Sequence, residues 1–383
     1  MGKVPRIFVV AGEPSADKHG ALLGEALRAQ REVHLAGVGQ SRMRDAGFEL
    51  LFDSTGWSGI GVIDSLRRVP GLMVRMRQLS SHLIARPPDL LVLIDFGAFN
   101  VRLARRIRAA VDCPVFYYFP PRSWSRDADY MGLAGLVDRV ATPFPWSERR
   151  LREAGIEAVW VGHPVVDRIG PLSPEDRADR RAKLGIEDGQ IALGLLPGSR
   201  EMEIRCNGPQ MLGAAAAVAG ELGNVQVLLS VAPGVSRDRL ARQVAGFGLA
   251  DRTRLVAGVA EIVQAADLAI VTSGTATLET AAAACPMLIV YRGTWLMSLE
   301  KRLRRFVVPF VGMPNIIADE EIVPELIDQN GVAPRIADTA LGLLRDEARM
   351  SEMRGRLLEV REQLGSPGVS ERVAGMALDL IPS

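Results

Sequence analysis

The 383-residue sequence predicts an α/β protein with two domains, each built on a parallel sheet covered by helices. Short apolar runs rich in β-branched residues alternate with longer segments of helical periodicity. These runs form one set before residue 165 and another after residue 190, and a charged segment separates the two sets. Strands that are apolar at nearly every position are typical of parallel sheets buried on both faces.

The first domain is expected over residues 1–167. Its clearest strands are IFVV (7–10), LLVLID (90–95) and VFYYF (115–119). Residues 168–190 contain two prolines, many charges and no apolar run. That composition is typical of a linker, so we expect a hinge there with one short helix.

The second domain is expected over residues 191–365, followed by a C-terminal helix (366–383) that packs back on the first domain. Its strands are the runs IALGLLP (191–197), VQVLLSV (225–231), LAIVTS (268–273) and MLIVY (287–291). Ligands of open parallel sheets bind beyond the carboxyl ends of the strands. We therefore expect the functional residues in loops that directly follow strands.

Composition excludes several classes of function. The 46 basic and 45 acidic residues give a net charge of +1, which rules out a large net attraction to nucleic acid. The three cysteines lie far apart, so neither a disulfide framework nor a zinc site is indicated. The sequence contains no run of about 18 uncharged apolar residues, so it predicts no membrane-spanning helix. We expect a reduced, cytoplasmic location.

Two turns of the second domain indicate a diphosphate site. In LLPGSREMEI (195–204), Gly198 allows a tight turn, Ser199 can cap the next helix, and Arg200 can bind an anion through two N–H groups. The free N–H groups of a helix start also attract anions. An ordinary strand–turn–helix with a surface arginine is the alternative.

The second turn lies in TSGTATLETA (272–281). Ser273, Gly274 and Thr275 precede a helix, and Glu279 follows one turn later on the same face, where it could accept from ribose hydroxyls. A well-capped helix explains this turn alone, but two such turns in one domain favour a nucleoside diphosphate. In MPNIIADEEIVPELI (313–327), Asn315 and Glu325 could bond a nucleobase or ribose, or simply cap a helix.

The first domain has polar residues after two of its strands. Glu13, Ser15 and Asp17 follow the first strand, without a GxGxxG fingerprint, and suit sugar hydroxyls or helix capping. Asp95 ends an apolar strand; a carboxylate leaving a buried strand tends to have a raised pKa, which suits a general base. The alternative for Asp95 is a structural helix cap.

Three further features of the first domain have more than one interpretation. Residues 59–86 alternate apolar side chains with arginines, which is typical of a helix on an anionic membrane or of an ordinary amphipathic helix. Asp127 and Asp129 form a DxD pattern, which can bind a metal with a diphosphate; we expect no metal here. His163 lies in a GHP motif beside the hinge, as a structural residue or a ligand contact.

The motifs, taken in order, resemble those of the lipid-A-disaccharide synthases, which are glycosyltransferases of the GT-B architecture. The matching pieces are AGEPSAD (11–17), GVIDSL (61–66), ID…FN (94–100), VGHPVVD (161–167), LLPGSREMEI (195–204), SGTATLE (273–279), CPMLIVYR (285–292) and MPNIIA (313–318). They span nearly the whole chain. The resemblance implies two Rossmann-like domains whose parallel sheets face across a cleft.

The resemblance also implies a reaction, an inverting hexosyl transfer without cofactor. UDP-2,3-diacylglucosamine would be the donor in the second domain, and 2,3-diacylglucosamine 1-phosphate the acceptor in the first. The products would be a β-1,6-linked lipid A disaccharide 1-phosphate and UDP. Asp95 would be the base and Arg200 would face the diphosphate.

Other residues receive roles from the same match. Ser199, Thr275, Glu279 and Asn315 would surround the nucleotide, and Asp64 stands where the family has glutamate on the acceptor side. The arginine-rich segment would face the cytoplasmic side of the inner membrane and bind acyl chains. The match leaves the oligomeric state open.

Several pieces on the acceptor side depart from the family pattern. Pro14 and Ala16 interrupt the GE(T/A)SGD motif, 96–98 read FGA instead of APD, and PPRSWSRD (120–127) replaces SPSVWAWR. A UDP-sugar transferase with a different acceptor is therefore one alternative. An enzyme like UDP-N-acetylglucosamine 2-epimerase is another, and a non-catalytic binding module is a third, which the retention of Asp95 and Arg200 disfavours.

Overall fold

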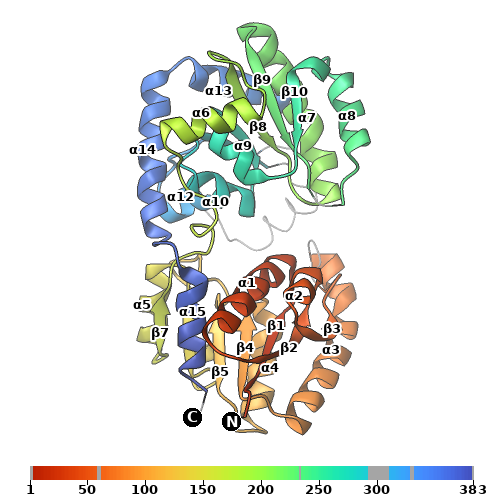
Figure 1. The fold of residues 1–383 in the computed structure, drawn as a ribbon, viewed down its shortest axis with the longest axis vertical. Coiled ribbons are helices and arrows are strands. Elements are labelled where there is room, and N and C mark those ends of the chain that lie inside the picture. Colours follow the sequence, from red (N-terminus) through yellow and green to blue (C-terminus); the bar gives the residue numbers. More distant parts are fainter. Residues whose placement is uncertain (1–2, 58–61, 233, 292–309, 328–331, 382–383) are drawn as a thin grey trace. The chain divides into compact units, whose positions relative to one another are not determined.

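The computed structural model describes residues 3–57, 62–232, 234–291, 310–327 and 332–381, without the side chains of 62–68 and 332. The chain forms two compact units (Figure 1). The first contains Met1–Pro164 and Gly365–Ser383, and the second contains Val165–Leu364. Both are parallel α/β units, which confirms the predicted fold class.

The first unit is a seven-stranded parallel sheet of order β3-β2-β1-β4-β5-β6-β7. β4 and β5 are buried at every residue, so helices cover both faces of the sheet there. Its elements are β1 (Arg6–Ala11), α1 (Pro14–Gln30), β2 (His34–Gly39), α2 (Ser41–Asp45), β3 (Glu49–Asp53), α3 (Val62–Ala85), β4 (Leu90–Ile94), α4 (Gly97–Arg108), β5 (Val115–Tyr118), η1 (Met131–Leu133), β6 (Arg139–Thr142), α5 (Pro145–Glu153), β7 (Ala158–Trp160) and α15 (Val369–Leu378).

The second unit is a six-stranded parallel sheet of order β10-β9-β8-β11-β12-β13. Its elements are α6 (Pro174–Lys183), β8 (Ile191–Leu196), α7 (Glu201–Leu222), β9 (Val225–Ser230), α8 (Arg237–Gly246), η2 (Ala250–Arg252), β10 (Thr253–Val256), α9 (Val259–Ala265), β11 (Leu268–Thr272), α10 (Thr275–Ala282), β12 (Met287–Tyr291), α12 (Met313–Ala318), β13 (Glu325–Ile327), α13 (Val332–Leu344) and α14 (Glu347–Gln363).

Each sheet has a point where the direction of strand winding reverses. In the first unit it lies between β1 and β4, and in the second between β8 and β11. Crevices form beyond the carboxyl ends of the strands at such points, because the connections on either side leave in opposite directions. The loops after these four strands therefore occupy the positions where ligands of this fold class bind.

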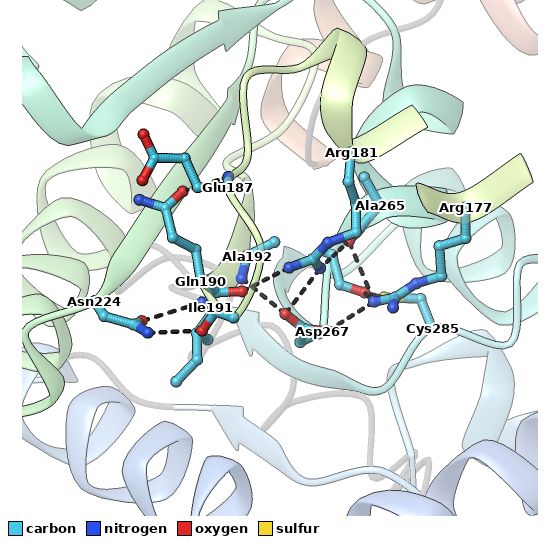
Figure 2. A network of polar contacts seen from close by, with 12 residues as sticks. Arg177, Arg181, Glu187, Gln190, Ile191, Ala192, Asn224, Ala265, Asp267 and Cys285 are labelled. Carbon is cyan, nitrogen blue, oxygen red and sulfur yellow. Dashed lines mark hydrogen bonds and ion pairs between the residues drawn. The ribbon is translucent and has the colours of Figure 1, made fainter. Parts of the chain in front are cut away.

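The segment expected as a hinge contains a helix that belongs to the second unit. Arg177 and Arg181 of α6 both bond the Asp267 carboxylate, at 2.7 and 3.1 Å, and also reach nearby backbone carbonyls (Figure 2). Burial alone would raise the pKa of Asp267, but the N–H of Ala192 and the two guanidinium groups hold that pKa below its usual value. Charge pairing thus fastens α6 to the start of β11.

The C-terminal segment returns to the first unit. α15 packs against α1, and the Gln30 side chain donates to the Glu371 carbonyl at 2.9 Å. The Arg372 guanidinium donates to the Val161 carbonyl at 2.9 Å. These contacts explain why the end of the chain completes the first unit.

Candidate active site

The two predicted turns of the second unit line one pocket of about 270 Å³ at the carboxyl ends of β8 and β11. The predicted residues that line it are Gly198, Ser199, Arg200, Ser273, Gly274, Thr275 and Glu279. They meet because β8 and β11 are neighbours in the sheet, although about 75 residues separate the turns in sequence. The pocket is therefore built at the reversal point of the second sheet.

The start of α10 lines this pocket. Gly274 precedes the helix with φ of 151°, a conformation that favours glycine, and as the N-cap residue it has no side chain to cap the helix start. Thr275 is exposed at the first helical position, whereas the Ser273 hydroxyl donates to the Val311 carbonyl at 2.9 Å. The Thr277 N–H donates to the Gly274 carbonyl at 3.1 Å, so the Thr275 and Ala276 N–H groups are the ones suited to a phosphate oxygen.

The start of α7 differs from the expectation of free N–H groups. The Glu203 carboxylate accepts from the N–H groups of Ser199 and Arg200, at 3.0 and 3.2 Å, and from Arg200 Nη1 at 3.1 Å. A Cβ at Gly198, where φ is 117°, would collide with that carboxylate. Glu203 also lines the pocket, and the sequence analysis missed it. Its place at the third helical position, typical of a capping box, was the available signal.

Asn315 and Glu325, predicted to contact the nucleotide, are not among the residues that line this pocket, and their side chains bond each other. The fully buried Asn315 amide donates to the Val323 carbonyl and to Glu325 Oε1, both at 2.8 Å, and its oxygen accepts from the N–H groups of Ile322 and Val323. Glu325 also accepts from two backbone N–H groups, at 2.8 and 2.9 Å. These bonds hold the start of α12 against β13.

Asp95 lies at the reversal point of the first sheet, immediately after β4. Burial and, to a smaller extent, the nearby Glu13 carboxylate raise the pKa of its carboxyl to about 6, although a hydrogen bond from the Phe96 N–H opposes both effects. Glu13 follows β1, the neighbour of β4, and precedes α1. The two carboxylates predicted on this side therefore interact, and Asp95 is poised to exchange a proton near neutral pH.

The other predicted residues of this side have different surroundings. Asp17 is buried and accepts from the N–H groups of Gln40, Arg42 and Met43, at 2.5, 3.1 and 3.3 Å, so it caps α2 instead of facing a ligand. Ser15 is half-buried in the first turn of α1. The Asp64 side chain lies outside the described residues.

The DxD residues are used locally. Asp127 pairs with Arg122 at 3.2 Å and accepts from the Ser125 hydroxyl, and Asp129 accepts from the Met131 N–H at 2.9 Å. Across the side chains that the structure describes, no group of three or more His, Cys, Asp or Glu residues gathers in a way that could hold a metal ion.

His163 belongs to an aromatic cluster of the first unit. Its ring contacts His19, Phe119 and Phe144, at centroid distances of 5.9, 5.3 and 6.4 Å. Burial and, to a smaller extent, the Lys18 charge lower the pKa of His163 to about 3. His163 is therefore neutral at physiological pH and packs as an aromatic residue.

Comparisons with known proteins agree with the geometry. The model of the lipid-A-disaccharide synthetase family matches residues 7–378. The lipid-A-disaccharide synthase of Geobacter sulfurreducens is 38% identical over 98% of this chain and 97% of its own, and that of Myxococcus xanthus is 37% identical over 100% and 99%.

Two solved structures share the fold at low identity. A Staphylococcus aureus MnaA–UDP co-structure has a TM-score of 0.64 at 14% identity, covering 99% of both chains. WaaG, a glycosyltransferase involved in lipopolysaccharide biosynthesis, has a TM-score of 0.54 at 13% identity, covering 97% of this chain and 99% of its own. At such identities these likenesses concern the fold alone.

Proposed function

We infer the reaction from the premise that this chain belongs to the lipid-A-disaccharide synthetase family. The matches confirm the predicted enzyme class, a glycosyltransferase of lipid A biosynthesis, over the epimerase alternative. We propose that the chain condenses UDP-2,3-diacylglucosamine with 2,3-diacylglucosamine 1-phosphate. The products are the β-1,6-linked disaccharide 1-phosphate and UDP.

The observation that carries this proposal is the pocket shared by the turns after β8 and β11. Arg200 supplies a guanidinium at its edge, and the open start of α10 supplies N–H groups. Both favour negative charge, and UDP gains charge as it leaves. Glu279, one turn into α10, lines the same pocket and is placed to accept from ribose hydroxyls.

Asp95 is the proposed base. A new bond forms between the acceptor's hydroxyl oxygen and C1 of the donor sugar, while the bond from C1 to the UDP oxygen breaks. Asp95 accepts the hydroxyl proton as the attack proceeds. Its raised pKa makes it a stronger base than an exposed aspartate while it remains ionised above about pH 6.

The test incubates purified protein with UDP-2,3-diacylglucosamine and candidate acylated acceptors, with mass spectrometry for the disaccharide. Product with the diacylglucosamine 1-phosphate supports the proposal. UDP release without this disaccharide would mean that the proposed acceptor is wrong. If no acceptor leads to UDP release, the proposed donor is wrong.

A matched pair of variants tests the diphosphate contact. Arg200→Ala should raise the donor KM and lower kcat by roughly 100-fold or more, because an aligned donor to developing charge is lost. Arg205→Ala, on an exposed part of α7 outside the pocket, should stay within about twofold of wild type. Equal effects of the two variants would contradict the assignment.

We also propose that α3 faces the cytoplasmic side of the inner membrane. Val69, Met73 and Val74 are exposed large apolar side chains on this helix, and Arg75 lies over the Phe52 ring at 5.1 Å. Apolar side chains interleaved with arginines suit an anionic lipid surface. None of the helices in the described part of the chain is long and apolar enough to cross a bilayer.

Sedimentation with vesicles containing anionic phospholipid tests this surface. The double variant Met73→Glu/Val74→Glu should bind at least tenfold more weakly than wild type. Ile327→Glu, at an equally exposed apolar residue of the second unit, should bind as wild type does. If both variants bind equally well, α3 is not the membrane face.

A further inference from the structure

The chain bends sharply between β4 and α4 through two consecutive residues in the left-handed region. Asp95 and Phe96 have φ of 48° and 49°. Outside glycine this conformation is uncommon and costs about 1–3 kcal/mol per residue, so surrounding contacts must hold it. Such strain concentrates at functional sites, and here it falls on the proposed base itself.

Two buried side chains stabilise the bend by donating hydrogen bonds to the same carbonyl oxygen. The Asp95 carbonyl accepts from Tyr117 Oη at 2.7 Å and from Asn100 Nδ2 at 2.8 Å. Asn100 Nδ2 also donates to the Ile94 carbonyl at 3.2 Å. Tyr117 comes from the adjacent strand β5, and Asn100 from the first turn of α4. Both are completely buried.

Two nearby glycines leave room for the side chains around the bend. A Cβ at Gly12, in the loop after β1, would collide with the Phe96 ring. A Cβ at Gly97 would likewise collide with Pro121, after β5. The loops after β1, β4 and β5 therefore pack closely around Asp95. The two hydrogen bonds to the Asp95 carbonyl fix the backbone of that residue.

We propose that Tyr117 and Asn100 are positioning residues, which direct the Asp95 carboxylate by fixing its carbonyl. The inference rests on the proposed role of Asp95 as base. Once the carbonyl is fixed, rotation of the Asp95 backbone is restricted, and the carboxylate leaves the bend in one direction. Holding a reacting group within a fraction of an ångström matters, since a misplacement of 1 Å can cost about 100-fold in rate.

The test is Tyr117→Phe, which removes the hydroxyl and keeps the ring. We expect kcat for disaccharide formation to fall roughly 10- to 100-fold while the KM of both substrates changes less than about threefold. The midpoint of the acid limb of the pH–rate profile should also move, because Asp95 changes its surroundings. UDP affinity, measured by calorimetry, should not change. Asn100→Ser should act in the same way.

Tyr130→Phe is the matched control. Its buried hydroxyl lies 2.9 Å from the Ser147 hydroxyl in the same unit, whereas the Asp95 carbonyl bonds Tyr117 and Asn100. It should lower the unfolding temperature without changing kcat or the acid limb. The double variant of Tyr117 and Asn100 should lose less activity than the two single losses multiplied, since both act on one carbonyl.

Two results separate the possible failures. If Tyr117→Phe and Asn100→Ser lower only the unfolding temperature, as expected for Tyr130→Phe, the hydrogen bonds to the Asp95 carbonyl are purely structural and the inference is overturned. If Asp95→Asn retains wild-type kcat, the proposed base itself is wrong. Loss of activity in Asp95→Asn, together with the kcat and pH changes in Tyr117→Phe, supports both proposals.

Discussion

Replacing Asp95 by asparagine should stabilise the protein while it abolishes catalysis. The carboxyl has a pKa of about 6, against a usual value of 3.8, chiefly because it is buried. Between these two values the folded chain holds a proton that the unfolded chain has released. Ionisation therefore costs the folded state free energy, and this cost is absent below about pH 4 and complete above about pH 6.

The size of the effect follows from the shift. About two pKa units correspond to about 3 kcal/mol. Asparagine avoids the cost, so at pH 8 Asp95→Asn should unfold roughly 6–12 °C above wild type, at about 2–4 °C per kcal/mol. At pH 4 the two proteins should unfold together. The variant should also lose at least about 100-fold in kcat, as expected for a general base.

Thermal unfolding at pH 4, 6 and 8 measures this, with Asp267→Asn as a control of opposite sign. The pKa of Asp267 is lowered, so its ionised form stabilises the fold at pH 8, and that contribution disappears as the pH falls through its folded-state pKa. Asp267→Asn should therefore be less stable than wild type at pH 8. If Asp95→Asn shows no gain at pH 8, the carboxylate is not desolvated and the argument for its basicity fails.

Three other variants test separate contacts. Glu13→Gln removes the like charge beside Asp95. The acid limb of the pH profile of kcat/KM, expected near pH 6 in wild type, should therefore move to lower pH. An unchanged limb would show that the two carboxylates do not interact. Gly274→Ala adds a Cβ at a φ of 151° and should weaken UDP binding about tenfold by calorimetry, whereas tolerance would mean that the start of α10 is not the phosphate seat. Arg181→Met leaves Asp267 with one guanidinium and should destabilise the second unit by about 2–3 kcal/mol in urea unfolding; a neutral effect would show that α6 is held by other contacts.

Most central strands were readable from the sequence, whereas β2, β6 and the edge strands were not. β4 and β11 are apolar at nearly every position because helices cover both of their faces. β3 (ELLFD) and β10 (TRLV) lie at sheet edges and carry charges, so no continuous apolar run marks them. The sequence alone therefore indicated parallel sheets but not their full extent.

The sequence predicted which loop residues lie at a common site wherever the position of the loop after a strand was enough to decide this. The turns that contain Gly198 and Gly274 follow two buried strands, and parallel strands bring their carboxyl ends to one edge. The direction of a polar side chain depends on partners that are distant in sequence. Asp17 turns inward to cap α2, which begins at residue 41, and Asn315 turns inward to bond Glu325.

Alternation of apolar strands with helices determined by itself that this protein has two parallel sheets with polar turns at their carboxyl ends. Only the tertiary structure decided that Asp17 caps α2, and that Tyr117 and Asn100 bond the Asp95 carbonyl. The physical reason is that burial pattern is a property of each segment, whereas hydrogen-bond satisfaction and backbone strain are settled between segments.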